Sequence, residues 1–316
     1  MLYVGTRCPT DVICQTSALA LSNLVLITRA NFLPLTVVIV SAGLAASLYA
    51  HGIFNPFDAS LVLIGALLTH AAANVFNNYF DYRSKVDAKT TKTPFSGGVT
   101  ILVEGKMKPS NALAVGLICL LGAAIIGIYF LTRKFYPLFP ILLFGLVAIC
   151  LYTPVLSKIH GLSEIVAGLG FGLMGLGVYV AETGTIDGSG VTVFVPVAIL
   201  VALLLFLNEF PDVEADRTAG RRHLVILFGR QRSAWIYVAG LVATYVSILV
   251  AVGTGIAPFP VLVSFITVPI AYKAAGIAVK SHDEISGLVP ALASNVIVIL
   301  STILLIAVGF VIAVYV

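Results

Sequence analysis

Charged residues are scarce in this chain. Only 10% of its 316 residues are Asp, Glu, Lys or Arg, whereas 59% are hydrophobic, and the mean hydropathy is +1.08. Soluble domains carry about 25% charged residues, so this composition excludes a soluble enzyme, a disordered chain and a nucleic-acid-binding protein. Because about 20 apolar residues span a bilayer, the composition indicates a protein embedded in a lipid membrane.

Cysteine is also scarce, and its pattern excludes two further classes of structure. The chain has only four cysteines, and their spacing does not resemble a set of metal ligands, so we expect no disulfide and no zinc site. The apolar runs are long and unbroken, which excludes a transmembrane β-barrel built from alternating strands of about ten residues. We therefore predict an all-α, polytopic membrane protein.

The apolar runs divide the chain into nine expected transmembrane helices. They cover residues 31–50, 59–80, 110–132, 136–156, 163–182, 190–211, 233–253, 257–280 and 288–315. Residues 1–30 make a poor signal peptide because polar residues interrupt them. We expect an N-terminal interfacial segment over 1–30, lying at the membrane surface, and one nine-helix domain over 31–316.

The basic residues predict how the helices are oriented. Lys and Arg favour the cytoplasmic side of a membrane. With nine spans, all 18 Lys and Arg except Arg133 and Lys134 fall on one side. We therefore expect a multi-pass protein of the cell membrane whose N-terminus and two longest polar loops, 81–109 and 212–232, are cytoplasmic. Glu182 and Asp187 then belong to the opposite face, as solvated loop charges.

A stripe of polar side chains marks the cytoplasmic end of the second span. At 100° per residue, five residues fall within about 100° of arc on an otherwise apolar helix. They are His70, Asn74, Asn77, Asn78 and Asp81. Ionisable groups in a membrane helix are costly when they face lipid, so such a stripe should face the interior of the bundle. By default, such groups also indicate a functional site. Asp87 joins the stripe only if the helix ends near Arg83.

A second acidic segment follows the sixth span. Asn208, Asp212 and Asp216 recur every four residues and share one helical face, Pro211 should kink the helix, and Gly220 suits a turn. Mg²⁺ prefers carboxylates together with substrate phosphates, and the neighbouring basic residues would bind the remaining phosphate charge. The two segments predict a diphosphate bridged to the protein by Mg²⁺, and an apolar bundle behind it suits a lipid-like tail. The alternative interpretation is that these acidic and basic residues are ordinary solvated charges of loops.

These motifs resemble those of the UbiA superfamily of intramembrane prenyltransferases, and most closely the dihydroxynaphthoate branch of the menaquinone pathway. The first motif is similar to Asn77-Asn78-Tyr79-Phe80-Asp81-Tyr82 followed by Asp87, with Asn78 where the family often has Asp. The second is similar to Asp212, Asp216, Arg217, Gly220 and Arg221. A Tyr-x-x-Pro-x-x-x-Lys signature is similar to Tyr152, Pro154 and Lys158.

The resemblance implies a nine-helix bundle with a central cavity that transfers a polyprenyl group from polyprenyl diphosphate to an aromatic quinone precursor. It implies two Mg²⁺ ions held by Asn77, Asp81, Asp87, Asp212 and Asp216. It implies catalytic roles for Asp81, Asp212, Asp216, Tyr152 and Lys158. It implies substrate contacts from Asn74, Asn77, Asn78, Lys92, Arg217 and Arg221. Lys92 lies in a loop where relatives carry an Arg-Pro pair. His70 is either a proton acceptor near the aromatic substrate or a histidine satisfied inside the bundle.

Two other functions compete with this interpretation. Within the superfamily, the acceptor could be a glyceryl phosphate lipid that receives a geranylgeranyl chain, although the spacing of Asp81 and Asp87 favours an aromatic acceptor. A cation-coupled transporter would need ionisable groups deep within its spans, whereas here nearly all lie at one end. The long motif of CDP-alcohol phosphotransferases is missing from the sequence.

Overall fold

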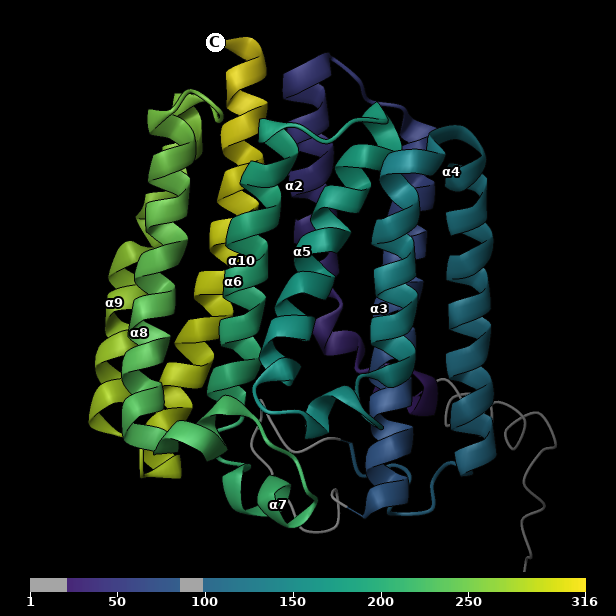
Figure 1. Cartoon of the computed structure of the whole chain (residues 1–316), viewed down its shortest axis with the longest axis vertical. Helices are drawn as coiled ribbons and strands as arrows, with labels where there is room; N and C mark the ends of the chain where they lie inside the picture. The colour runs from purple at the N-terminus through teal and green to yellow at the C-terminus, as the bar shows by residue number, and fades with distance from the viewer. Residues whose placement is uncertain (1–21, 86–98) are drawn as a thin grey trace, which may run out of the picture.

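The computed structural model describes residues 22–85 and 99–316. Its described residues form helices joined by short turns, and none of them is in a β-strand. Figure 1 shows the long helices running side by side along the longest axis, with short α7 at one end of the bundle and the C-terminus at the other. The part of the expected interfacial segment at 1–21, together with Asp87 and Lys92, lies outside the described residues.

The helices follow the apolar runs, because a backbone in lipid must satisfy its own hydrogen bonds. The long ones are α2 (Pro34–His51), α3 (Pro56–Ser84), α4 (Pro109–Leu151), α5 (Leu162–Thr183), α6 (Gly188–Asn208), α8 (Leu224–Gly253), α9 (Val268–Lys280) and α10 (Ile285–Tyr315). The short ones are η1 (Ala30–Phe32), η2 (Leu156–Lys158), α7 (Val213–Thr218) and η3 (Phe259–Thr267), the last of which leads directly into α9.

Eight helices among the described residues are long and apolar enough to cross a membrane, counting η3 and α9 as one. The chain is thus an all-α, multi-pass integral membrane protein. The third expected span and residues 136–151 of the fourth fall within α4, which has 43 residues and is interrupted at Lys134 (φ −136°, ψ 43°). Eight candidate spans therefore stand where the sequence predicts nine.

Close packing of α5 against α6 depends on glycine. A Cβ atom built on Gly172 would lie 2.8 Å from the Cβ of Ala198 and 2.9 Å from the carbonyl oxygen of Phe194, closer than a side chain allows. Small residues let helix backbones approach in a membrane. This contact fixes α6, whose end carries the second acidic segment, against α5.

The second acidic segment is not one kinked helix, so the expectation for Pro211 is wrong. Helix α6 ends at Asn208, residues 209–212 form turns, and α7 begins at Val213. Pro211 lacks an N–H and cannot continue a helical ladder, and here the helix has already ended before it. Gly220 adopts φ 78° after α7, as expected for a turn, and the chain then enters α8 at Leu224.

Candidate active site

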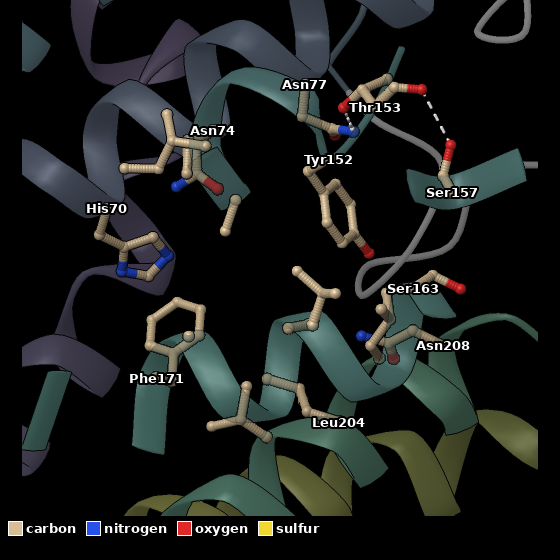
Figure 2. Close-up of a pocket in the computed structure, with 18 of the residues that line it drawn as sticks. His70, Asn74, Asn77, Tyr152, Thr153, Ser157, Ser163, Phe171, Leu204 and Asn208 are labelled. Carbon is tan, nitrogen blue, oxygen red and sulfur yellow. Dashed lines mark hydrogen bonds between the residues drawn. The ribbon is translucent and has the colours of Figure 1, made fainter. Parts of the chain in front are cut away.

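A pocket of about 330 Å³ lies between α3, the end of α4, α5 and α6. Deep in the pocket the lining is largely apolar, with Phe171, Met174 and Leu204 among the contributors. Toward the α7 end the lining is polar. Figure 2 shows Asn74, Asn77, Tyr152 and Asn208 around the pocket, with the Tyr152 hydroxyl directed toward Ser163 and Asn208. The pocket thus joins an apolar region to a charged one.

The two acidic segments meet through one arginine. Nη2 of Arg221 donates to Oδ1 of Asp81, and Nη1 donates to Oδ1 of Asp216 at 2.9 Å. Both carboxylates are buried, at 5% and 4% exposure. Burial alone would lower the pKa of Arg221, but the carboxylates of Asp81 and Asp216 raise it above its usual range. Helix α3 and the α7–α8 connection therefore place acids from the two motifs on a shared guanidinium.

Two more oxygens in this region have no hydrogen-bond partner among residues 22–85 and 99–316. Oδ1 of Asp212 and Oδ1 of Asn208 are buried and unpaired, and both residues line the pocket. Burial and the neighbouring Asp216 carboxylate raise the pKa of Asp212 to about 7. Unpaired buried oxygens are costly, and carboxylate and amide oxygens are the ligands that Mg²⁺ takes in proteins. The residues present therefore fit a magnesium site.

The pocket brings together most of the residues that the sequence singled out. Those lining it are Asn74, Asn77, Asp81, Tyr152, Asp212, Asp216 and Arg221. Asn77 also donates to the Thr153 hydroxyl at 3.1 Å, which links α3 to the end of α4. Lys158 and Arg217 are exposed, and they are not among the lining residues.

Asn78 has contacts outside the pocket. Its Oδ1 accepts hydrogen bonds from Nε and Nη2 of Arg29, and its Nδ2 donates to the carbonyl of Ile27 at 3.0 Å. Asn74 donates in the same way to the carbonyl of Thr28 at 2.9 Å. Asparagine supplies both a donor and an acceptor, so this side of the stripe fastens residues 27–29 to α3.

Arg29 lines the pocket and was not among the expected site residues. It adopts a left-handed conformation with φ 50°, which is uncommon for a residue with a side chain and is accompanied by the paired hydrogen bonds to Asn78. A solitary arginine immediately before an apolar span was the available signal. Sequence reasoning gave Arg29 no role in the site.

His70 lies beside Phe171, across the pocket from Ser163 and Asn208 (Figure 2). Its Nδ1 is 2.7 Å from the Thr36 hydroxyl, and its ring meets that of Phe171 edge to face at 4.8 Å between centroids. These contacts satisfy one ring nitrogen, as expected for a histidine held inside a bundle, while the ring still borders the pocket.

Glu209 and His223 also line the pocket, and sequence reasoning gave neither a role in the site. His223 precedes α8, and its Nε2 lies 3.4 Å from Oδ2 of Asp216. Glu209 follows α6, and its Oε2 is 3.6 Å from Nδ1 of His223. Both residues sit beside the second motif in the chain, which was the signal available.

An apolar pocket that opens onto paired acidic motifs in a helical membrane bundle defines an intramembrane enzyme for a charged, lipid-like substrate. Residues 36–289 match the UbiA prenyltransferase family, and the chain belongs to this family. It is thus a UbiA-family prenyltransferase, an enzyme that transfers a prenyl group from a prenyl diphosphate, as the sequence motifs predicted.

Relatives agree with this assignment. The 1,4-dihydroxy-2-naphthoate octaprenyltransferase of Bacillus subtilis (strain 168) is 28% identical over 211 residues, which cover 66% of this chain and 67% of the relative. The apo structure of a UbiA homologue from Aeropyrum pernix K1 has a similar fold, with a TM-score of 0.68 and 19% identity over 89% of this chain and 98% of that one. A UbiA homologue from Archaeoglobus fulgidus, solved with DMAPP and Mg²⁺, has a TM-score of 0.58 and 13% identity over 93% of this chain and 98% of that one.

Proposed function

We propose that this enzyme transfers a polyprenyl group from polyprenyl diphosphate to an aromatic quinone precursor of the dihydroxynaphthoate type, with release of diphosphate. The observation that carries the proposal is the meeting of Asp81 and Asp216 on Arg221 at the polar end of an apolar pocket. A substrate with a diphosphate head and an isoprenoid tail matches both parts of that pocket. The naphthoate acceptor is supported by the similarity to the Bacillus subtilis enzyme and by the spacing of the first motif.

Mg²⁺ would be held by Asp81, Asp212 and Asp216, with the amide oxygens of Asn77 and Asn208 beside them. Bound there, it would neutralise charge that develops on the departing diphosphate. We propose two ions, one for each motif, because one carboxylate group lies on α3 and the other follows α6. Asp87 completes the first motif in the sequence.

The basic residues would bind the diphosphate and its leaving charge. Arg221 already lies between the motifs, and bidentate guanidinium contacts suit phosphate oxygens. Arg217 and Lys158 are exposed, and we propose that they, with Lys92, attract the substrate from outside the pocket. Tyr152 would face the reacting carbon, where its ring can stabilise positive charge by a cation–π contact.

The apolar pocket would accommodate the isoprenoid tail and exclude water from the allylic cation. The acceptor ring would attack that cation and then lose a proton. Deeper polar groups are few, and His70 is one of them. In the naphthoate type of reaction, the acceptor's carboxylate would also leave as CO₂, and the ring carbon would take up a proton in its place.

We also propose that α4 crosses the membrane twice, which gives nine crossings around a central cavity. A helix needs about 20 residues to cross a bilayer, so the 43 residues of α4 suffice for two crossings. Figure 1 shows the ribbon turning back near the α4 label. With nine crossings and the preference of Lys and Arg for the cytoplasmic side, we propose that the site and the N-terminus are cytoplasmic and that Arg133 and Lys134 lie on the other face.

The test is an assay of the purified protein with a panel of polyprenyl diphosphates and acceptors, read by mass spectrometry. We expect Mg²⁺-dependent prenylation of a dihydroxynaphthoate. Asp81→Ala and Asp212→Ala should each abolish most turnover, and their combined effect should be less than additive, because residues acting as a unit do not sum. The exposed Glu214→Ala is the matched control. Prenylation of a glyceryl phosphate lipid alone would contradict the aromatic acceptor.

A further inference from the structure

Three buried side chains form a separate cluster beside the acidic motifs. Glu164, Glu209 and His223 each offer a ligand atom, and these atoms lie within 4.8 Å of one another. Glu164 lies in the first turn of α5, Glu209 follows α6, and His223 precedes α8. Their exposures are 3%, 7% and 1%. Three elements far apart in the chain therefore bring two carboxylates and an imidazole to one buried point.

Within the part of the chain that the structure describes, two atoms of this cluster have no hydrogen-bond partner. They are Oε2 of Glu209 and Nε2 of His223. Burial and the neighbouring Glu164 carboxylate raise the pKa of Glu209 well above its usual range. Leaving such groups unpaired is expensive, so the arrangement is one that a bound ligand would stabilise.

The imidazole is set up for a metal ion on one nitrogen. Nδ1 of His223 faces Oε2 of Glu209 at 3.6 Å, and Nε2 faces Oδ2 of Asp216 at 3.4 Å. Metal-binding histidines commonly donate their other N–H to a carboxylate. Oδ2 of Asp216 is the carboxylate oxygen that faces Nε2, although the two atoms form an ion-pair contact and no hydrogen bond. Nδ1 accepts a hydrogen bond from the Ile226 N–H at 3.3 Å, but the same N–H also donates to the His223 carbonyl at 3.1 Å. Nδ1 can therefore turn to an ion while that N–H keeps its backbone partner.

Glu164 keeps capacity for an ion as well. One of its oxygens accepts from the Leu224 N–H and the other from the Ser163 hydroxyl, both at 2.6 Å. Each carboxylate oxygen has a further lone pair. These bonds hold the carboxylate still at the start of α8, so that its remaining lone pairs have a fixed direction.

We propose that Glu164, Glu209 and His223 bind a divalent transition-metal ion of the Zn²⁺ type, at a site distinct from the two Asp motifs. One imidazole nitrogen and two carboxylate oxygens are a donor set for Zn²⁺ with a fourth position open. Glu209 and His223 line the pocket, which gives an ion access. Through Nε2–H of His223, the ion would fix the orientation of Asp216.

The test measures metal binding directly and does not depend on turnover. Full-length protein in detergent, with Mg²⁺ in excess to occupy the Asp motifs, is titrated with Co²⁺, whose d–d absorption reports the site, and then with Zn²⁺. We expect about one Co²⁺ per chain, displaced by Zn²⁺. Glu209→Gln and His223→Asn should weaken binding at least about tenfold. Glu214→Gln and His282→Asn, which change an acid and a histidine elsewhere, should bind as the wild type does.

Three results would overturn the proposal. They are no Co²⁺ bound by the wild type, Co²⁺ binding by the Glu209 and His223 variants equal to that of the wild type, and loss of Co²⁺ binding in the single variant Asp81→Asn. Thermal unfolding checks that each variant is folded. X-ray absorption of the Zn²⁺-loaded wild type needs no variant, and it should show nitrogen and oxygen ligands with a single imidazole. Sulfur or several imidazoles would contradict the site. Prenyl transfer without this ion would leave the proposed function intact.

Discussion

Arg221 offers a sharp test of how the acidic site is held together. In Arg221→Met, a side chain of similar length loses all its donors, so Asp81 and Asp216 keep their burial but lose their shared cation. Removing one partner from a buried ion pair costs about 3–5 kcal/mol. Arg221 is 21% exposed, whereas the two acids are 7% and 5% exposed at the side chain, so most of this cost should fall on the carboxylates.

The same variant should respond to Mg²⁺ more strongly than the wild type. Without the guanidinium, the two carboxylates are free to bind the ion, and a ligand that binds only the folded state stabilises it. We therefore expect Arg221→Met to melt several degrees below the wild type without Mg²⁺ and to recover most of that loss as Mg²⁺ is added. Turnover should nevertheless fall, because the diphosphate loses a bidentate contact.

Thermal unfolding in detergent across a Mg²⁺ titration measures both effects. The control is Arg222→Gln, which changes the exposed neighbouring arginine, whose guanidinium contacts His160. Equal melting of Arg221→Met and wild type without Mg²⁺ would refute the claim that the bridge compensates buried charge. An equal Mg²⁺ shift in both proteins would refute the competition between Arg221 and the ion.

Three further variants test separate parts of the structure. Asn78→Asp should keep activity, because a carboxylate still accepts from Arg29, but it loses its donor to a backbone carbonyl and should cost about 1 kcal/mol of stability; an inactive, folded variant would contradict this. Lys158→Ala should raise the apparent KM for polyprenyl diphosphate without changing the melting temperature, and an unchanged KM would remove Lys158 from the site. Gly172→Val should destabilise the protein by about 1–3 kcal/mol or more through overpacking, whereas Gly170→Val, with open space around it, should be much milder in the same unfolding assay.

The positions of the helices could be predicted from the sequence because lipid imposes one strong rule. In lipid, every apolar segment has to form its backbone hydrogen bonds internally. The apolar runs of the sequence and the helices of the structure therefore coincide closely. The third and fourth expected spans are the exception, since they form a single element interrupted at Lys134. The interruption lies inside the gap at 133–135 that the sequence leaves between the two spans, and a gap this short leaves the helical hydrogen bonding nearly continuous.

The candidate site was predicted well where one helix carries it and less well where several elements meet. The stripe on α3 follows from helical geometry, and Asn74, Asn77 and Asp81 line the pocket as expected. The prediction that Asn208, Asp212 and Asp216 share one face of a continuous helix was wrong, because the helix ends at Asn208. The three still reach the same pocket, because the turns at 209–212 and α7 return the chain to it.

Contacts between distant segments could not be predicted from local patterns. Asp187 was expected to be a solvated loop charge, yet it caps α6 and bonds to Tyr179 and to His51 at 2.9 Å. Glu182 was expected to be solvated too, yet it is buried and accepts from the Asn55 N–H at 3.2 Å. Such partners depend on how helices pack, and composition and spacing carry no information about them.

The charge balance of the site explains why ions should matter to the fold as well as to the reaction. Asp81 and Asp216 share one guanidinium, while oxygens of Asp212 and Glu209 are buried without a hydrogen-bond partner among the described residues. Buried carboxylates in this number are unfavourable unless cations compensate them. Cations bound at a site that carries more acid than base would therefore stabilise the fold. Affinity for metal and stability of this end of the bundle should thus rise and fall together, which is the linkage that the Arg221 titration measures.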